Sequence, residues 1–275
     1  MARTIQKIRL ILFVLIASGS LHAKVIATDG ASTAHRLLLF GSEKAIQSGY
    51  YALNGEQQKL GTLFVPLRYD FETKGLWNPY VYGCAGYGAA KYTQSADAPW
   101  MNMVSLELGA GVRYAINTHT DLRLGGAYQL AQFHALSSTR GHGYEAAASL
   151  DYHPQIGRWS PYLQANVRYT GTSVDFQNNT TTTRSLIGSL KAGVITPVFA
   201  RPFGLPVKLE LYGTLLSLHG DMPTLLGTRY LWNTGIQLYI QSPIARDWIS
   251  DITLGIQCVR GENFKGFSVG AGIQF

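Results

Sequence analysis

Apolar and polar residues alternate along most of this chain. In MVSLELGAGVRYAI, residues Val104, Leu106 and Leu108 share one face, whereas Ser105 and Glu107 lie on the other. A period of two is that of a β-strand with one apolar face, and a helix would not separate the two sets. The unit recurs from residue 60 onward, between breaks rich in Gly, Pro, Asn, Asp, Ser or Thr. The pattern predicts eleven strands, at about 60–71, 79–91, 102–116, 119–133, 143–153, 160–171, 184–197, 205–217, 228–240, 248–260 and 265–275.

The opposite faces of these strands carry charged side chains. Long strands with one apolar and one charged face fit two structures: a soluble barrel or sandwich with an apolar interior, or a membrane barrel with an apolar exterior and a polar lumen. In a membrane barrel the charged set would line the lumen, and it comprises Arg68, Asp70, Lys91, Glu107, Arg113, Asp121, Arg123, Glu145, Asp151, Arg168, Lys191, Lys208, Glu210, Arg229 and Asp251.

Three features favour the membrane barrel. The strands are long enough for the roughly 9–11 tilted residues that cross hydrocarbon. Alternate connections, such as SVDFQNNTTTTR and LHGDMPTLLG, are longer and more polar than the others, as expected of external loops opposite short periplasmic turns. Aromatic residues also bracket the apolar faces near the strand ends, as expected at two membrane interfaces; these are Tyr69, Phe71, Trp77, Tyr80, Tyr82, Trp100, Tyr114, Tyr152, Trp159, Tyr169 and Trp248.

The number of strands must also be even, because an unpaired edge is not tolerated in lipid. If the last strand ends in the periplasm, the strand at 60–71 begins outside, so an earlier segment must carry the chain outward. We expect a first strand within about 36–53, where RLLLFGSE and AIQSGYYAL are the candidates. A helix that threads the lumen outward from Lys24 is the alternative. The predicted fold is therefore all-β: a transmembrane antiparallel up-and-down β-barrel of 12 strands, with a short N-terminal segment that either forms the first strand or enters the lumen.

The chain stops on an alternating run, KGFSVGAGIQF. One face of this run is apolar and ends in the last residue of the chain. We expect it to be the closing strand, which seals against the first strand in lipid and places its last ring at the periplasmic interface. Its outward residues are Phe267, Val269, Ala271, Ile273 and Phe275.

The other end of the chain has the pattern of a secretory signal peptide. Arg3, Lys7 and Arg9 precede the apolar run 10–16, which is too short to span a bilayer as a helix, and Ala23 offers a small residue before a cut. The expected division is a cleaved signal at 1–23, an N-terminal segment at 24–58 and a barrel at 59–275, exported to the outer membrane of a Gram-negative bacterium.

Composition excludes some partners and pairings. Loss of the three signal-peptide cations, without any acid, lowers the formal net charge from +7 to +4, and the chain has no basic run of the kind that binds nucleic acid. Charged residues make up 14%, below the roughly 25% usual in soluble domains. The two cysteines, Cys84 and Cys258, lie on well-separated predicted strands among outward apolar residues, so no disulfide is expected.

The segment DITLGIQCVRGENFKGFSVGAGIQF resembles the end of the solitary outer-membrane autotransporter-type β-barrel domains, in which an RG-[DE]-N-F-like turn leads into a Gly-rich closing strand. LELGAGVRYAINTHTDLRLGGAYQLAQF and FVPLRYDFETKGLWNPYVYGCAGYG are similar to the early strands of that family. The resemblance implies a twelve-stranded barrel like an autotransporter translocator, without a secreted passenger. It also implies that the barrel-assembly machinery recognises the last strand. It supplies no catalytic residues.

The sequence gives little support for a catalytic site or a metal site. A barrel-embedded lipid hydrolase would require a Ser and a His together on strand ends with an orienting group. His134 with Ser137, and Ser217 with His219 followed by Asp221, are the nearest approaches. The chain has no histidine or cysteine pair at metal-ligand spacing and no Asp-rich calcium loop, so no metal or cofactor is expected.

The predicted lumen set has eight basic and seven acidic members. An ion-selective pore would favour one sign, whereas near balance favours ion pairs between neighbouring strands. We therefore predict a narrow or plugged lumen in a non-enzymatic barrel with a surface or structural role, whose partners are outer-membrane lipid and the assembly machinery. A small-solute channel is the first alternative, and a barrel-embedded lipid hydrolase or acyltransferase is the second.

Overall fold

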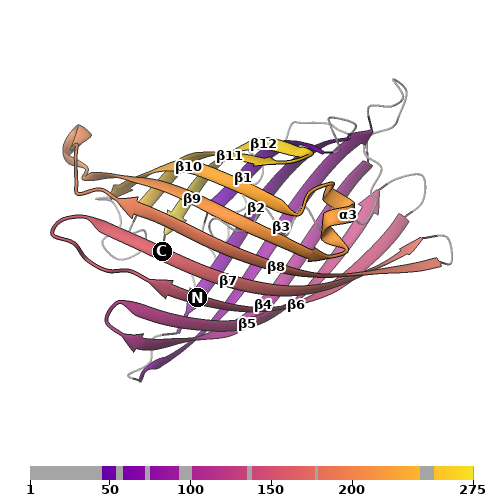
Figure 1. Ribbon diagram of the computed structural model, residues 1–275, viewed down its shortest axis with the longest axis horizontal. Helices are drawn as coiled ribbons and strands as arrows, with labels where there is room; N and C mark the ends of the chain where they lie inside the picture. Colours follow the sequence, from indigo (N-terminus) through magenta and orange to yellow (C-terminus); the bar gives the residue numbers. More distant parts are fainter. Residues whose placement is uncertain are drawn as a thin grey trace, which may run out of the picture.

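The computed structural model describes residues 45–53, 58–71, 75–92, 101–134, 138–176, 179–241 and 251–274. Over this part, twelve antiparallel strands form a closed barrel in which each strand pairs with its neighbours in sequence and β1 pairs with β12 (Figure 1). The predicted up-and-down barrel is therefore confirmed. No helix in the described part of the chain is long and apolar enough to cross a membrane.

The strands are β1 Ala45–Leu53, β2 Gln58–Asp70, β3 Trp77–Tyr92, β4 Met101–Asn117, β5 Thr120–His134, β6 Ser138–Tyr152, β7 Ser160–Phe176, β8 Asn179–Ile195, β9 Val207–Gly220, β10 Tyr230–Gln241, β11 Asp251–Gly261 and β12 Phe264–Gln274. A short 3-10 turn, η1 (Pro202–Gly204), precedes β9, and a short helix, α3 (Met222–Leu226), follows it. The strand positions match the predicted alternation, and AIQSGYYAL, the second candidate, forms the first strand.

The barrel closes where β1 meets β12. Direct partners across this seam include Tyr50 with Phe267 and Ile46 with Ala271. The rings of Tyr50 and Phe267 have centroids 6.3 Å apart on the outer surface. The closing strand thus pairs as its sequence predicts, whereas Phe275 lies outside the described residues.

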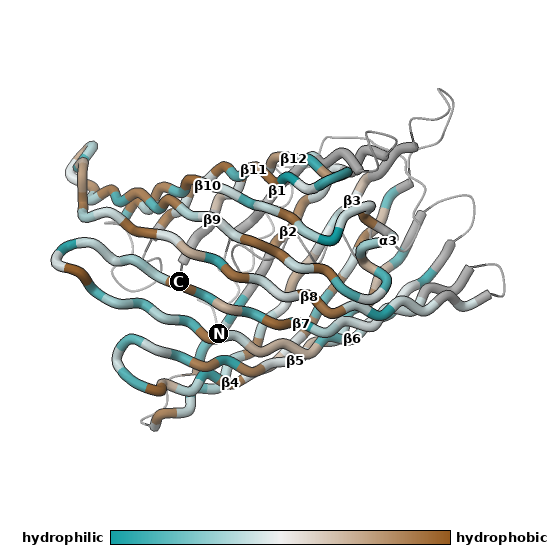
Figure 2. Tube along the Cα trace, in the orientation of Figure 1, coloured by the Kyte–Doolittle hydropathy of each residue, from teal (hydrophilic) through white to brown (hydrophobic). Residues whose placement is uncertain are grey.

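The apolar faces of the strands point away from the lumen. On β4, Leu108 is 62% exposed while its neighbour Glu107 is 3% exposed, and the same contrast separates Leu130 from Gln129 on β5. Hydropathy alternates residue by residue along the strands (Figure 2). An exposed apolar exterior around buried polar groups identifies a transmembrane barrel and excludes a soluble sandwich with an apolar centre.

Strand β3 faces the opposite way from the prediction. Tyr80 and Cys84 are buried inside the barrel and Tyr82 points inward with them, whereas Val81 and Ala85 are exposed. Both faces of WNPYVYGCAGYG carry apolar or aromatic residues, so alternation alone does not select the outward face. Tyr80 and Tyr82 are therefore not interfacial aromatics, and Cys84 does not face lipid; Cys84 and Cys258 are both free thiols.

An aromatic band does surround one end of the barrel. The ring centroids of Trp77 and Tyr114 are 4.4 Å apart, and those of Tyr69 and Phe71 are 5.0 Å apart. Tyr152 and Trp159 are exposed at the same end. Trp100 and Trp248, predicted for the aromatic bands, lie outside the described residues.

The two ends of the barrel differ in their connections. The α3 end holds the turns β1–β2, β3–β4, β5–β6, β7–β8, β9–β10 and β11–β12, and the terminus end holds the other connections. The expectation of longer loops at the α3 end was wrong for SVDFQNNTTTTR, because β7 and β8 extend through it and only residues 177–178 separate them. Residues 196–206 make a longer link at the terminus end. Polar composition indicated a loop, but paired strands that extend into water also carry polar side chains.

The predicted signal at 1–23 lies outside the described residues, as does the N-terminal segment up to residue 44. The ranges 54–57, 72–74, 93–100, 135–137, 177–178 and 242–250 and residue 275 lie outside them as well.

Candidate functional site

The lumen is the candidate site, because most of the charged residues predicted to face inward stand there. Twelve members of the predicted set stand at inward positions, six basic and six acidic: Arg68, Asp70, Glu107, Arg113, Asp121, Arg123, Glu145, Asp151, Arg168, Lys191, Lys208 and Glu210. Lys208 is exposed at the terminus end of β9. The charge of this inward set is therefore balanced.

A ladder of ion pairs runs across β4, β5, β6 and β7. Arg113 contacts Asp121 at 2.7 Å and Arg123 contacts Asp151 at 3.0 Å. Direct partners on these strands have like charge, because Arg113 faces Arg123 and Asp121 faces Asp151. Each ion pair therefore joins diagonal neighbours and relieves the repulsion between direct partners.

The ladder continues at the next pair of strands. Glu145 on β6 and Arg168 on β7 are 3.2 Å apart, and both side chains are buried. Arg68 and Asp70 form a separate pair within β2 at 2.7 Å, where the Arg68 guanidinium lies 4.0 Å from the centroid of the Tyr80 ring. Opposite charges within hydrogen-bond distance explain how the barrel holds buried ions.

A second network lies across β7 to β10 and centres on Glu210. The Lys191 ammonium is 3.2 Å from Glu210 Oε1. The hydroxyl of Tyr162 donates to the same oxygen, and the hydroxyl of Tyr239 donates to Oε2 at 2.6 Å. Lys191 also lies 4.1 Å from the centroid of the Tyr212 ring. This carboxylate is satisfied on both oxygens, as a buried charge requires.

The network extends to β11 through neutral groups. The hydroxyl of Tyr212 donates to Gln257 Oε1 at 3.0 Å, and the Asn233 amide donates to the same oxygen at 2.9 Å. Side-chain contacts along the inner face of the barrel thus join five adjacent strands, β7 to β11.

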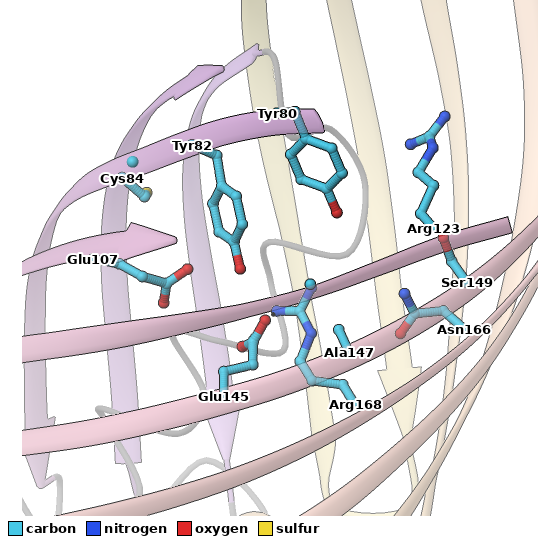
Figure 3. A pocket seen from close by; sticks show the side chains of 12 residues that line it. Tyr80, Tyr82, Cys84, Glu107, Arg123, Glu145, Ala147, Ser149, Asn166 and Arg168 are labelled. Carbon is cyan, nitrogen blue, oxygen red and sulfur yellow. Dashed lines mark ion pairs between the residues drawn. The ribbon is translucent and has the colours of Figure 1, made fainter. Parts of the chain in front are cut away.

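A small polar cavity lies beside the ion-pair ladder. Its volume is about 50 Å³, and Tyr82, Glu107, Glu145, Asn166 and Arg168 are among the residues that line it (Figure 3). This is space for a few water molecules rather than for a sugar or a peptide. The cavity is thus bounded by members of the ion-pair ladder, Glu145 and Arg168 among them.

The α3 end of the lumen is apolar. Its buried cluster comprises Phe64, Cys84, Ile187, Leu216, Leu218, Met222, Leu226, Leu231, Val259 and Phe264. Two of these, Met222 and Leu226, belong to α3 and are fully buried. The helix thus shares one buried cluster with inward residues of seven strands and forms a lid, which we define as residues Asp221–Gly227.

Both ends of the lid are held by hydrogen bonds. At its start, the Arg184 amide donates to Asp221 Oδ2 at 2.7 Å, and the Asp221 amide donates to the Arg184 carbonyl at 3.0 Å. At its end, the side-chain amide of Asn263, in the β11–β12 turn, donates to the Gly227 carbonyl at 3.0 Å. Gly227 has φ +68°, a left-handed conformation that ends the helix at low cost. The lid is thereby fixed to β8 on one side and to the β11–β12 turn on the other.

Three predicted lumen residues are not placed in the network. Alternation on β3 puts position 91 in the outward set, opposite to the predicted inward position, and the side chain of Lys91 lies outside the description. Arg229 precedes β10 and is exposed at the α3 end, because β10 begins later than predicted. Asp251 is the first residue of β11, and its side chain lies outside the description.

The predicted assembly residues occupy the outer face of β12. Phe267, Val269 and Ala271 are exposed on that face. Ile273 pairs with Ile252 of β11, which is itself exposed. These residues form one apolar stripe beside the seam.

One of the two Ser–His candidates does come together. Ser217 Oγ and His219 Nε2 are 2.8 Å apart on the outer face of β9. Asp221 does not orient this histidine, because its Oδ2 accepts the Arg184 amide. Ser137 of the other candidate lies outside the described residues. Among the described residues, no group of three His, Cys, Asp or Glu is placed to hold a metal ion.

The lid and the contacts of the inward tyrosines were missed by sequence reasoning. MPTLL is short and sits in a polar stretch, LHGDMPTLLG, which predicts an external loop. A signal was present, because Met222, Leu225 and Leu226 are apolar and Gly227 directly follows them, as at a helix C-terminus.

Comparison with known proteins gave matches only among solved structures; no protein-family model and no curated sequence matches the chain. The translocator domain of the autotransporter NalP from Neisseria meningitidis superposes with a TM-score of 0.66 at 13% identity, covering 89% of this chain and 95% of that chain. The β-domain of the Bordetella autotransporter BrkA gives 0.56 at 16% identity, covering 84% and 97%. The transport unit of AIDA-I from Escherichia coli gives 0.55 at 12% identity, covering 86% and 92%. The chain therefore has the fold of autotransporter translocator barrels.

Proposed function

We propose that this chain is a non-enzymatic barrel of the outer membrane of a Gram-negative bacterium, with a closed lumen and a surface or structural role. The observation that carries the proposal is the lid: α3 buries Met222 and Leu226 against inward residues of the strands. An apolar lid held at both ends opposes the passage of ions, because a hydrated ion would lose its water shell there.

The polar half of the lumen supports the same function. Five of its six basic side chains make ion pairs with neighbouring carboxylates at 2.7–3.2 Å. Charges engaged with one another are poorly placed to conduct one sign of ion selectively. Tyrosine rings occupy further space, since Tyr80, Tyr82, Tyr162 and Tyr212 point inward. We infer that the barrel does not carry a passenger through this lumen, although its fold is that of translocator domains.

The proposed orientation places the α3 end outside the cell and the terminus end in the periplasm. The chain would be exported by a cleaved signal at 1–23. The outward stripe of β12, with Phe267, Val269, Ala271, Ile273 and Phe275, would be recognised by the barrel-assembly machinery. The exposed apolar exterior would contact the outer-membrane lipid.

The proposal excludes catalysis at Ser217. A serine nucleophile needs a base that is itself oriented, and the carboxylate next to His219 in sequence is bound to the Arg184 amide instead. Purified protein should therefore not hydrolyse phospholipid or glycolipid, and Ser217→Ala should leave lipid composition unchanged. Lipid turnover that disappears in Ser217→Ala would contradict this part of the proposal.

Conductance of the purified barrel in planar bilayers tests the proposed function. The wild type should give a closed baseline. Leu226→Asp should increase conductance, because a charge in the apolar cluster would displace the lid. Thr224→Asp is the matched control, because Thr224 is exposed on the same helix and the added charge remains in water.

Heat-modifiable migration should show that both variants remain folded. Steady open-channel current from the wild type would support the small-solute channel instead and overturn the proposal. An unchanged closed baseline in folded Leu226→Asp would show that the lid is not what closes the lumen.

A further inference from the structure

Basic residues on the outer surface form a row at the α3 end, across the seam of the barrel. Direct partners in this row are Trp232 with Arg260, Arg260 with Lys265, and Lys265 with Ala52. The register continues from Ala52 to Lys59 and from Lys59 to Lys91. Four cationic residues thus occupy one row over six neighbouring strands, from β10 through β11, β12, β1 and β2 to β3. We call this the basic row.

The basic row lies on the outward face. Arg260 follows Ile256 and Cys258 on the exposed face of β11, and Lys265 precedes Phe267 on that of β12. Both cations are themselves exposed. Each is the second residue from the α3 end of its strand, and so are Lys59 and Lys91. The basic row therefore lies at the boundary between the apolar outer surface of the barrel and its α3 end.

The charge pattern of the basic row is the opposite of that in the lumen. Inside, diagonal carboxylates offset like charges on neighbouring strands. Outside, Arg260 faces Lys265 and Lys59 faces Lys91, and the members of the row include no acid. Like charges directly opposite one another destabilise a sheet. Glu262, in the turn between β11 and β12, is exposed and is close to Arg260 and Lys265 in sequence.

The next outward row toward the middle of the barrel carries no charge. It contains Thr234, Cys258, Phe267, Tyr50 and Gly61, each the direct partner of the next. Beyond it, Ile256 and Val269 are direct partners and are 60% and 50% exposed. A ligand that fits both rows carries a negative head group at the level of Arg260 and Lys265 and acyl chains along Phe267, Ile256 and Val269. A soluble anion or an acidic peptide would use only the first row.

We propose that the basic row binds the phosphate groups of a phosphorylated glycolipid in the leaflet that surrounds the α3 end. This rests on the proposed function in one respect, since that leaflet is the external one only in the proposed orientation. Arg260 and Lys265 bind the phosphates, and Trp232, 61% exposed beside Arg260, contacts the sugar at the interface. Bound phosphate would relieve the repulsion between the two cations.

Binding is measured on the folded, purified barrel in neutral detergent. A bisphosphorylated glucosamine-based glycolipid is titrated, and retained lipid is counted by native mass spectrometry. The same glycolipid without its phosphates and phosphatidylglycerol serve as comparison ligands. The variant is Arg260→Gln with Lys265→Gln, and the matched control is Arg158→Gln with Arg201→Gln, which removes two exposed cations from the terminus end.

The wild type and the Arg158/Arg201 control should bind the phosphorylated glycolipid equally. The Arg260/Lys265 variant should bind on the order of thirty-fold more weakly, because each cation near an anionic lipid contributes about a fivefold change in affinity and two cations are removed. Equal binding by the Arg260/Lys265 variant would overturn the site. Equal binding of the dephosphorylated glycolipid would overturn the role of phosphate, and equal binding of phosphatidylglycerol would overturn the assignment to a glycolipid.

Failure here is distinguishable from failure of the proposed function. Binding in detergent does not depend on conductance or on orientation in the cell. If the barrel does not conduct and does not bind the glycolipid, only the proposed glycolipid site is wrong. If the barrel conducts and binds the glycolipid, only the proposal of a closed lumen is wrong.

Discussion

The ring of Tyr162 on β7 occupies the space above Gly193 on β8, its direct partner across the two strands. A Cβ at Gly193 would lie 2.5 Å from Cζ of that ring, closer than atoms pack. The same relationship recurs for Tyr82 with Gly109, Tyr80 with Gly111, Tyr212 with Gly235 and Tyr144 with Gly171. Glycine on one strand thus allows the neighbouring tyrosine to lie close to the wall and reach its polar partner.

Gly193→Ala should therefore destabilise the barrel by about 1–3 kcal/mol, the usual effect of overpacking. Gly188→Ala on the same strand is the control, because the nearest atom to its added Cβ is 4.0 Å away. Urea unfolding in lipid vesicles measures both. In a Tyr162→Ala background, Gly193→Ala should cost much less; an unchanged cost would show that the ring is not what the methyl group meets.

The most predictable property of this fold was which face of each strand points outward and which points into the lumen. Leu108 and Glu107 separate cleanly because their strand has charges on one face and aliphatic residues on the other. Strand β3 has no such contrast, and its orientation follows instead from register, which seats Tyr80 and Tyr82 over Gly111 and Gly109. Register is a property of two strands together, so a single strand's alternation does not determine it.

The lid was unpredictable for a different reason. A helix as short as α3 is not stable by itself, so its existence depends on tertiary contacts. Those contacts come from residues distant in sequence, among them Phe64 and Phe264, which share the apolar cluster with Met222 and Leu226. The ion pairs were foreseen as a class from the charge balance, but the particular partners required the register. The basic row, likewise, becomes visible only when Lys59 and Lys265 are brought to one seam.

A charge placed on the outer face of β4 should cost more stability than neutralisation of the inward carboxylate beside it. Leu108 lies near the middle of β4 and is exposed on the outer face. Leu108→Arg should reduce the free energy of unfolding by about 2–4 kcal/mol, as for a cation at mid-bilayer. Glu107→Gln, one position along, should be milder because its side chain stays in the polar lumen. Urea unfolding in lipid vesicles compares the two, and equal losses would contradict the facing of β4.

Removing one partner from the Glu210 network should leave a buried charge without compensation. Glu210→Leu should destabilise the barrel by about 3–5 kcal/mol, because Lys191 is then a buried cation that has lost its carboxylate. The double variant Lys191→Met with Glu210→Leu should be more stable than the single variant, since neither ion remains. Chemical unfolding of the three proteins measures the difference.

Asp70→Asn is the control for that experiment. Asp70 also pairs with a buried arginine, but the Asp70 side chain is 43% exposed, and the asparagine keeps an oxygen that can accept from Arg68, so this variant should cost less stability than Glu210→Leu. A Glu210→Leu protein as stable as Asp70→Asn would mean that water enters the lumen freely at Lys191.

The reactivity of the two thiols should distinguish the outer face of the barrel from its interior. Cys258 is exposed on the outer face and Cys84 is buried in the apolar cluster under the lid. A maleimide that dissolves in detergent should therefore modify only Cys258 in the folded barrel and both thiols after unfolding, as intact mass would show. Folded Cys258→Ser protein should remain unlabelled. Labelling of Cys84 in that variant would show that the reagent reaches this thiol and that it is not sealed in the apolar cluster.

Truncation of the last residue should impair assembly in cells. The outer face of β12 presents Phe267, Val269 and Ala271 to lipid, and the same alternation continues to Phe275. Deletion of Phe275 should reduce the heat-modifiable, membrane-inserted fraction, because the proposed recognition by the assembly machinery uses the terminal ring. Phe275→Tyr keeps a ring and should assemble normally. Purified, denatured Phe275-deleted protein should still refold in detergent, since the barrel register does not require the last residue; failure to refold would assign the ring a structural role instead.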